Sequence, residues 1–582
     1  LFQMFFFRAV GEGRLAEAFG PAAAETDKFV RIVGFRRAGE AETAQVSPDT
    51  RGALEAYSRG VNEFLHTHKG NLPLEFNLLG MEAIEDWQPA DTVTFGKVEA
   101  WDLTSTWDSE LMASDLRAKL GADRAALLMP GFPKEGPFTV PGANSGGLLP
   151  LVKTYQANIK PWLVNPLSDG LGSNNWVVDG AKSATGKPLL ANDPHLGVRN
   201  PSIWYQVHLS TSDGKYDDVG FGFAGVPGII TGHNQNIAWG VTNLESDVQD
   251  LYQEKLDSGG HPGQYFSAGK WLPMQVLTET IKVKGSDDIT ETVRITGHGP
   301  IISDALLITD TLGSGVERPF ALKWTASQPG KLLDSVLGLQ TAANWQDFRA
   351  ALANWSVPGQ NFVYADKQGN IGYQATGQLP VRNNWRGDVP VQGNGDFEWA
   401  GFIPFDEMPR VYNPPEHYIA TANNPPFGPN FKYPVSGYYA QPWRIDRILE
   451  MLKAKDKLSA DDFKAMQADT QSPLAKQVAP FIAGLKPPAD QPEQQKMVDM
   501  FKGWDGNLKT DSVSAAIYEV FYQKVLSETL SDDLGTDLYA EYLSVEGWGA
   551  MQAVAQLLSK PDDPFWDKSG TDQKEKRDDI LL

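Results

Sequence analysis

A Gly-Ser pair, Gly172-Ser173, lies where a loop-like stretch of the sequence turns into a strand-like one. The residues from Gly170 to Val178 read Gly-Leu-Gly-Ser-Asn-Asn-Trp-Val-Val. Tryptophan and valine are typical of strands, whereas the Gly- and Pro-rich sequence ahead of them is typical of a loop. A serine at this boundary is a candidate nucleophile, but serine needs a base to take its proton. The sequence has neither a GxSxG elbow nor a complete phosphate loop, so this chemistry needs another arrangement.

Six short motifs follow, and together with the Gly-Ser run they resemble the penicillin acylase family of N-terminal nucleophile hydrolases. They are Pro188–Gly197, Gly232–Asn234, Ala238–Asn243, Asn361–Asp366, Gly369–Tyr373 and Ala422–Pro425. The motifs cover nearly the whole chain in family order, and several ordered matches arise by chance far more rarely than one. The family normally has further strands ahead of Leu1 and continues beyond Leu582, so we expect a chain trimmed at both ends.

In that family a Gly-Ser bond cuts itself and the freed serine becomes the catalyst. The resemblance therefore implies cleavage between Gly172 and Ser173. A free α-amine titrates near ~7.7–8.0, so it is substantially neutral at working pH and can take the proton of its own hydroxyl. Ser173 would be nucleophile and base at once. We expect an inactive precursor that yields fragments 1–172 and 173–582, which remain together as a heterodimer.

The resemblance assigns three further residues to the catalytic site. The side chain of Asn423 and the backbone N–H of Asn243 would stabilise the oxyanion, and His195 would lie close to the serine amine. From the residues alone, an ordinary turn ahead of Pro425 is the preferred interpretation of Asn423, and a helix or turn cap is the alternative for His195.

The same resemblance implies a structural calcium ion. Asp247 and Asp250 are three residues apart, and carboxylates so placed can converge on a hard cation. Glu110 would be the third carboxylate, and Gln249 would add its backbone oxygen. Glu110 precedes the cleavage site and the others follow it, so the ion would join the two fragments. Without the resemblance, two spaced aspartates are more often a solvated face.

The expected substrate is a small N-acyl amide of the β-lactam or acyl-homoserine lactone type. Thr231 and Glu245 fall where phenylacetyl-preferring relatives have aromatic pocket residues, which argues against a tight fit for benzylpenicillin. Arg444 is assigned to the leaving group, although a surface ion pair is the alternative. The sequence leaves the preferred acyl group and amine open.

Periodicity indicates the elements that position these residues. Apolar residues recur every three or four positions in 51–68, 115–128 and 516–530, which predicts helices. Residues 203–210 alternate with period two, which predicts a strand, and the middle of the chain is predicted to be sheet.

We divide the chain at the expected cleavage site. Residues 1–140 form a mostly helical region, 141–172 a linker or spacer, and 173–582 the region that begins with the nucleophile. The resemblance implies an α+β fold of four layers, αββα, in which two antiparallel sheets pack face to face.

Composition excludes several classes of function. The 582 residues carry a net charge of −22, which disfavours nucleic acid and anionic membranes as partners. Because the chain has no cysteine, it has no disulfide and no thiol nucleophile. No apolar run is long enough to predict a membrane span. No signal peptide is evident either, and the expected periplasmic or secreted location comes from the resemblance.

The sequence also offers two alternative functions. Gly220–Gly225 matches the dinucleotide fingerprint GxGxxG, but Pro227 and Gly228 stop the helix that must follow it. The second alternative is a secreted ligand-binding protein that keeps the fold and does not process itself. The intact Gly172-Ser173 pair and Asn423 argue against it.

Overall fold

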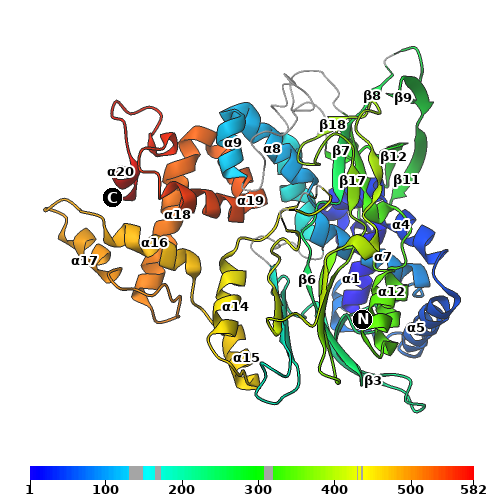
Figure 1. The fold of residues 1–582 in the computed structure, drawn as a ribbon. Coiled ribbons are helices and arrows are strands. Elements are labelled where there is room, and N and C mark those ends of the chain that lie inside the picture. The colour runs from blue at the N-terminus through cyan, green and yellow to red at the C-terminus, as the bar shows by residue number, and fades with distance from the viewer. Residues whose placement is uncertain are drawn as a thin grey trace. The chain divides into compact units, whose positions relative to one another are not determined.

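A computed structural model describes residues 1–129, 149–163, 172–257, 259–306, 319–428, 430–433, 435 and 437–582 (Figure 1). Within these ranges the chain forms two compact units: the first contains residues 1–110 and 150–439, and the second contains 111–129 and 440–582. This division does not coincide with the one expected at the cleavage site, because segments on both sides of Ser173 share the first unit.

The strand that carries Ser173 is the middle of a three-stranded antiparallel sheet. Its order is β2-β1-β21, with β1 at Gly172–Val178, β2 at Leu189–His195 and β21 at Tyr418–Thr421. The register places Ser173 opposite Pro194. Trp176 and the two valines after it are buried, so the apolar end of β1 anchors the strand and leaves the serine at its start.

A seven-stranded antiparallel sheet lies against this one, with the order β20-β16-β15-β6-β5-β4-β3. Its strands are β3 (Trp204–Ser210), β4 (Asp217–Phe223), β5 (Thr231–His233), β6 (Ile237–Asn243), β15 (Gln360–Asp366), β16 (Ile371–Ala375) and β20 (Arg410–Tyr412). β1 packs against β6 and β15. At Gly240 in β6 an added Cβ would lie 2.7 Å from the side chain of Asn175, so glycine permits the close approach of the two sheets.

The main core of the sheet lies on its helical side. Trp239, Phe362 and Tyr364 are buried there against residues of α12 (Leu332–Thr341) and α13 (Trp345–Leu352), and α12 can be followed in Figure 1. The strands β6 and β15 are buried along nearly their whole length, as expected for strands covered on both faces.

Smaller sheets complete the first unit. They contain β7 (Gln249–Gln253), β8 (Lys255–Leu256), β9 (Gln264–Ser267), β10 (Lys270–Pro273), β11 (Gln275–Ile281), β12 (Ile289–Thr296), β13 (Gly299–Pro300), β14 (Phe320–Trp324), β17 (Pro380–Arg382), β18 (Val391–Gln392) and β19 (Trp399–Phe402).

The helices are divided between the two units. Those of the first unit are α1 (Phe2–Glu12), α2 (Ala16–Phe19), α3 (Ala24–Val33), α4 (Phe35–Thr43), α5 (Pro48–Thr67), α6 (Leu74–Leu78), α7 (Pro89–Thr104) and α11 (Ser303–Leu306), besides α12 and α13. α8 (Trp107–Leu120) and α10 (Leu149–Thr154) cross the boundary. The described part of the second unit is helical: α9 (Ala122–Leu128), α14 (Trp443–Lys453), α15 (Ala460–Gln467), α16 (Pro473–Ala483), α17 (Pro492–Met500), α18 (Val513–Leu534), α19 (Thr536–Leu557) and α20 (Arg577–Leu581).

Several predicted elements are confirmed. The helices expected at 51–68 and 516–530 are α5 and α18, and the strand expected at 203–210 is β3. The helix expected at 115–128 is broken into α8 and α9 at Gly121, whose φ of 78° a helix does not accommodate. No helix follows Gly220–Gly225, which lies in β4 and the turn after it, in agreement with the rejection of the dinucleotide site.

The structure corrects the middle of the predicted linker, 141–172. α10 continues into a π-helical turn at Tyr155–Ile159, and Tyr155 is buried. The Trp101 indole donates to the Tyr155 hydroxyl at 3.0 Å, and the ring of Trp107 also contacts Tyr155. The apolar spacing of Leu151, Tyr155 and Ile159 was the missed signal, hidden between Pro- and Gly-rich flanks. Residues 141–148 and 164–171 of that prediction lie outside the described residues.

None of the helices in the described ranges is both long enough and apolar enough to cross a membrane.

Candidate active site

Ser173 is held at the start of β1 by its backbone nitrogen. Its side chain and backbone are buried, with 7% of the residue exposed. The Ser173 N–H donates to Asn423 Oδ1 at 2.6 Å. In the uncut chain this nitrogen belongs to the Gly172-Ser173 peptide bond, and cleavage of that bond would turn the same atom into an α-amine. Asn423 therefore contacts the atom on which the predicted chemistry depends.

Asn423 adopts an unusual backbone conformation just after β21. Its φ is 63°, in the left-handed region that asparagine tolerates better than most residues. The Asn423 amide nitrogen donates to the backbone oxygen of Asn243 at 2.9 Å, at the end of β6. These two hydrogen bonds fix the amide between the serine strand and the seven-stranded sheet. They bring together Ser173, Asn243 and Asn423, which are 70 and 250 positions apart along the chain from the serine.

Two further asparagines position this group, and the sequence did not single them out as site residues. Asn361 Nδ2 donates to the backbone oxygen of Asn243 at 3.0 Å, and the Tyr373 hydroxyl donates to Asn361 Oδ1. Asn192 Nδ2 donates to the carbonyls of Asn174 and Val241, so it bridges β2, β1 and β6. Asn361 opens a motif that carried the family resemblance, which was the available signal.

His195 lies one position past Ser173 in the β1–β2 register, opposite Gly172. Its Nε2 is 2.6 Å from Asp193 Oδ2, and Asn174 Nδ2 donates to the same carboxylate oxygen at 2.9 Å. The structure thus places His195 beside the start of β1, with its imidazole oriented by Asp193. A direct role on the serine amine stays a prediction.

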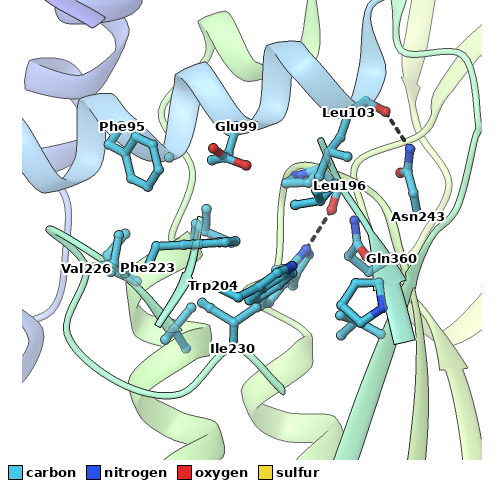
Figure 2. A pocket seen from close by; sticks show the side chains of 18 of the residues that line it. Phe95, Glu99, Leu103, Leu196, Trp204, Phe223, Val226, Ile230, Asn243 and Gln360 are labelled. Carbon is cyan, nitrogen blue, oxygen red and sulfur yellow. Dashed lines mark hydrogen bonds between the residues drawn. The ribbon is translucent and has the colours of Figure 1, made fainter. Parts of the chain in front are cut away.

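Ser173 and Asn243 line one cavity in the first unit (Figure 2). Most of the other lining residues are apolar: Phe95, Leu103, Pro194, Leu196, Trp204, Phe223, Val226, Ile230, Val241, Leu332, Leu333, Val336, Trp355 and Pro358. The cavity draws on α7 and α12 as well as on both sheets. Asn243 Nδ2 donates to the Leu103 carbonyl at 2.6 Å, which ties the end of α7 to the site. An apolar group attached to a carbonyl at Ser173 has room here.

Glu99 is the acidic side chain among the described lining residues. It lies on α7 with 5% of its surface exposed, and Figure 2 shows its carboxyl pointing from the helix toward the cavity. Neither carboxyl oxygen has a hydrogen-bond partner among the described residues. Burial, with a smaller effect of the Asp102 charge, raises the pKa of Glu99 well above its ordinary value, and the Arg199 charge only partly opposes this. The direction of this shift favours the protonated, uncharged form of the Glu99 carboxyl.

The four residues assigned to calcium lie close together, on or next to α8 and β7, and two of them are paired with an arginine. Arg382 Nη2 donates to Asp247 Oδ2 and Arg382 Nε to Asp250 Oδ2, each at 2.8 Å. All three side chains are at most 4% exposed. Glu110 Oε2 accepts from the backbone of Leu251, and burial together with the two aspartates raises the pKa of Glu110.

This arrangement does not fit a calcium ion. The Arg382 guanidinium lies against both aspartates, in the place where a cation would neutralise them, and two such positive charges exclude each other. The side-chain oxygen of Gln249 accepts from the backbone of Thr106 at 3.0 Å. In the described ranges no group of three or more acidic, histidine or cysteine side chains could hold a metal. No step below involves a metal.

Of the predicted substrate residues, Thr231 and Glu245 belong to the first unit, and neither is among the lining residues of the described cavity. The Thr231 hydroxyl donates to Asn192 Oδ1 at 2.8 Å and faces the interior between the sheets, because its neighbour Ile230 takes the lining position. Glu245 has a left-handed φ of 58° beyond the end of β6, and it is not a lining residue of the described cavity. Arg444 belongs to α14 of the second unit, so its leaving-group role stays a prediction.

Comparison with known proteins finds a family model and named relatives that match this chain. A family model described as penicillin amidase matches residues 1–582. The chain is 31% identical over 608 residues to the acyl-homoserine lactone acylase QuiP of Pseudomonas aeruginosa, an alignment that covers 100% of this chain and 71% of that protein. It is 30% identical over 537 residues to the penicillin acylase 2 proenzyme of Pseudomonas sp. (strain SE83), covering 90% of this chain and 66% of that protein.

A solved structure is also similar. The thermostable penicillin G acylase from Alcaligenes faecalis superimposes with a TM-score of 0.54 and 27% identity, covering 63% of this chain and 66% of that chain. The match confirms the predicted α+β fold class with packed antiparallel sheets.

Proposed function

The chain belongs to the penicillin amidase family of amide-hydrolysing enzymes, and we propose that it is a self-processing acylase whose nucleophile is Ser173. The observation that carries the proposal is the meeting of Ser173, Asn423 and Asn243 at an apolar cavity. A relative named as a proenzyme supports the processing step. The proposed location, in the periplasm or outside the cell, rests on the resemblance alone.

The proposed reaction begins with cleavage of the Gly172-Ser173 bond. The serine nitrogen, still held by Asn423 Oδ1, becomes an amine that titrates near ~7.7–8.0. This amine takes the Oγ proton while Oγ attacks the substrate carbonyl. The same proton then passes to the departing amine as the C–N bond breaks and an acyl-enzyme forms. Water, deprotonated by the amine, attacks the ester and releases the acid.

The tetrahedral intermediates place a negative charge on the former carbonyl oxygen. We assign its stabilisation to the Asn423 amide and the backbone N–H of Asn243, which belong to elements fixed by hydrogen bonds before substrate arrives. Donors that need no rearrangement stabilise a transition state best. Asn361 acts through Asn243 and is a positioning residue.

Two features support an aliphatic N-acyl amide as the substrate class. The cavity lining is largely aliphatic and aromatic, and six of the most similar relatives carry the name acyl-homoserine lactone acylase. We therefore propose N-acyl homoserine lactones with medium-length chains as the first compounds to test, with benzylpenicillin as the comparison.

Mass analysis of purified protein tests the processing and kinetics tests the nucleophile. Wild type should give fragments 1–172 and 173–582, apart from any further trimming ahead of Ser173, and Ser173→Ala should stay a single inactive chain. Asn423→Ala should lower kcat by about 10²–10³-fold, the usual loss for one oxyanion donor. An active single chain with Ser173 still in peptide linkage would overturn the mechanism. A folded, unprocessed and inactive wild type would favour the binding-protein alternative.

A further inference from the structure

We propose that Glu99 makes this cavity specific for acyl chains that carry one uncharged oxygen, a hydroxyl or a ketone, part of the way along an otherwise apolar chain. This inference rests on the proposed function, because it concerns the acyl group of the same substrate. It assigns the residue a role in specificity, separate from the bond-breaking step at Ser173.

The first argument is the cost of an unpaired polar group. Both Glu99 oxygens are buried without a hydrogen-bond partner in the described ranges, and the residue is 5% exposed. Folded proteins pair nearly all buried polar atoms, so an exception calls for a physical reason. A cavity beside the carboxyl supplies one, since a bound molecule can provide the missing partner.

The second argument concerns which partner fits. A neutral carboxylic acid has one O–H donor and a carbonyl acceptor, so it pairs with a hydroxyl in either direction and with a ketone through its O–H. An anionic group on the acyl chain would meet no positive charge in the lining, because no lysine or arginine is among the described lining residues. Arg199 lies near enough to influence Glu99, but its guanidinium carbon lies 5.6 Å from the ring centroid of Phe7 and forms no ion pair with Glu99.

The third argument is the place of Glu99 relative to the reacting centre. Leu103 is four residues later on α7, which is one helical turn, and its carbonyl accepts from Asn243 beside Ser173. Along the helix axis Glu99 is thus about 6 Å from Leu103, on the side away from Asn243 and Ser173. Its carboxyl therefore faces the body of the acyl chain, some carbons away from the scissile carbonyl.

A second buried donor lines the same cavity. Within the part of the chain that the structure describes, the indole Nε1 of Trp204 has no hydrogen-bond partner. Figure 2 shows Trp204 on the side of the cavity opposite the helix that carries Glu99. An oxygen on the acyl chain can accept from an indole N–H as well as from a carboxylic acid. A plain alkyl chain would displace any water and leave both groups unpaired.

The test uses processed wild-type enzyme and homoserine lactones acylated with decanoate or with decanoate hydroxylated at carbon 3, 5, 7 or 9. One position should exceed the plain chain in kcat/KM by roughly 10- to 100-fold, because only that oxygen reaches the carboxyl. Glu99→Gln, which keeps a donor and an acceptor, should retain most of the ratio, whereas Glu99→Leu should bring it close to one. Asp102→Asn is the matched control, since it removes the negative charge next to Glu99 and keeps the Glu99 carboxyl.

A binding measurement separates this inference from the proposed function. Calorimetry of decanoic acid and the hydroxydecanoic acids with the same proteins needs no hydrolysis. If no lactone is hydrolysed but one hydroxy acid binds more tightly and loses this advantage in Glu99→Leu, the proposed function fails and the inference holds. If no hydroxyl position raises kcat/KM or affinity above the plain chain, or if Glu99→Leu keeps the ratio, the inference is wrong.

Discussion

The Glu99 carboxyl and the carboxylates of Asp247 and Asp250 are buried to a similar degree, yet they are neutralised by different means. Asp247 and Asp250 are paired with the guanidinium of Arg382, at 2.8 Å each. Glu99 has no hydrogen-bond partner among the described residues, and burial raises its pKa, which favours the protonated form. A buried carboxyl needs either a counter-charge or a proton, and the first unit of this protein uses both solutions.

The difference separates a structural site from a binding site. Where Arg382 neutralises the charge, the hydrogen-bonding capacity of the carboxylates is spent within the protein. The Thr106 hydroxyl also donates to Asp247, so this cluster joins residues on both sides of Ser173. Where a proton neutralises the charge, a donor and an acceptor remain available to a ligand. The Arg382 cluster should therefore govern stability, and Glu99 should govern substrate choice.

The largest expected effect is on the arginine cluster. Arg382→Met should lower the free energy of unfolding by about 3–5 kcal/mol, because it leaves two buried carboxylates without their counter-charge. Denaturant unfolding of the Ser173→Ala chain, which stays uncut, gives the value without loss of a fragment. The control is Arg410→Met, whose ion pair with Asp406 is exposed and should contribute less than about 1 kcal/mol. Equal losses in the two variants would contradict the structural role of the cluster.

A smaller effect on the free energy of unfolding is expected at Glu99, where the substitution Glu99→Gln should make the protein more stable than wild type as pH rises. The folded-state pKa lies above the ordinary 4.5, so between those two values the folded protein holds a proton that the unfolded chain has lost. Wild-type stability should therefore fall, relative to Glu99→Gln, as pH rises from about 4.5 toward the folded pKa, by at most about 1.4 kcal/mol per pH unit. Asp102 and Arg199 are the charged groups that act on Glu99.

Stability curves of wild type, Glu99→Gln and Asp102→Asn from pH 4 to 9 would measure this. Removal of the Asp102 charge should narrow the pH range over which wild-type stability falls, because that charge contributes to the raised pKa of Glu99. Parallel curves for wild type and Glu99→Gln would mean that Glu99 is ionised in the folded protein, and the contrast with the Arg382 cluster would disappear.

The sequence located the nucleophile strand and the two aspartates of the cluster, but it located neither Arg382 nor Glu99. The run at Ser173 located the nucleophile strand, because tryptophan and valine after a Gly-rich stretch indicate β1 directly. The meeting of Asn423 with Asn243 is a contact between distant segments, which only the family resemblance could suggest. Asp247 and Asp250 were read as cation ligands for the same reason.

Arg382 and Glu99 could not be found by spacing. Arg382 is 132 residues from Asp250, and no local pattern connects β17 with β7. Glu99 lies in a helix buried on almost all sides, where apolar periodicity is lost. The available signal was a charged residue between Val98 and Ala100, both fully buried, but a sequence does not show whether such a residue has a partner, as Lys97 has in Glu42.

The smallest expected effect concerns metal removal, where the structure and the sequence-based calcium prediction differ. Because the Arg382 guanidinium already pairs with both Asp247 and Asp250, chelation should leave the melting temperature of wild type unchanged. In Arg382→Ala the carboxylates lose their counter-charge, so added Ca²⁺ should bind the folded state and raise the melting temperature with its concentration. Thermal unfolding with and without chelator, after elemental analysis of the purified protein, measures both. A wild type that contains calcium and melts lower after chelation would show that the ion displaces Arg382, and the original calcium prediction would stand.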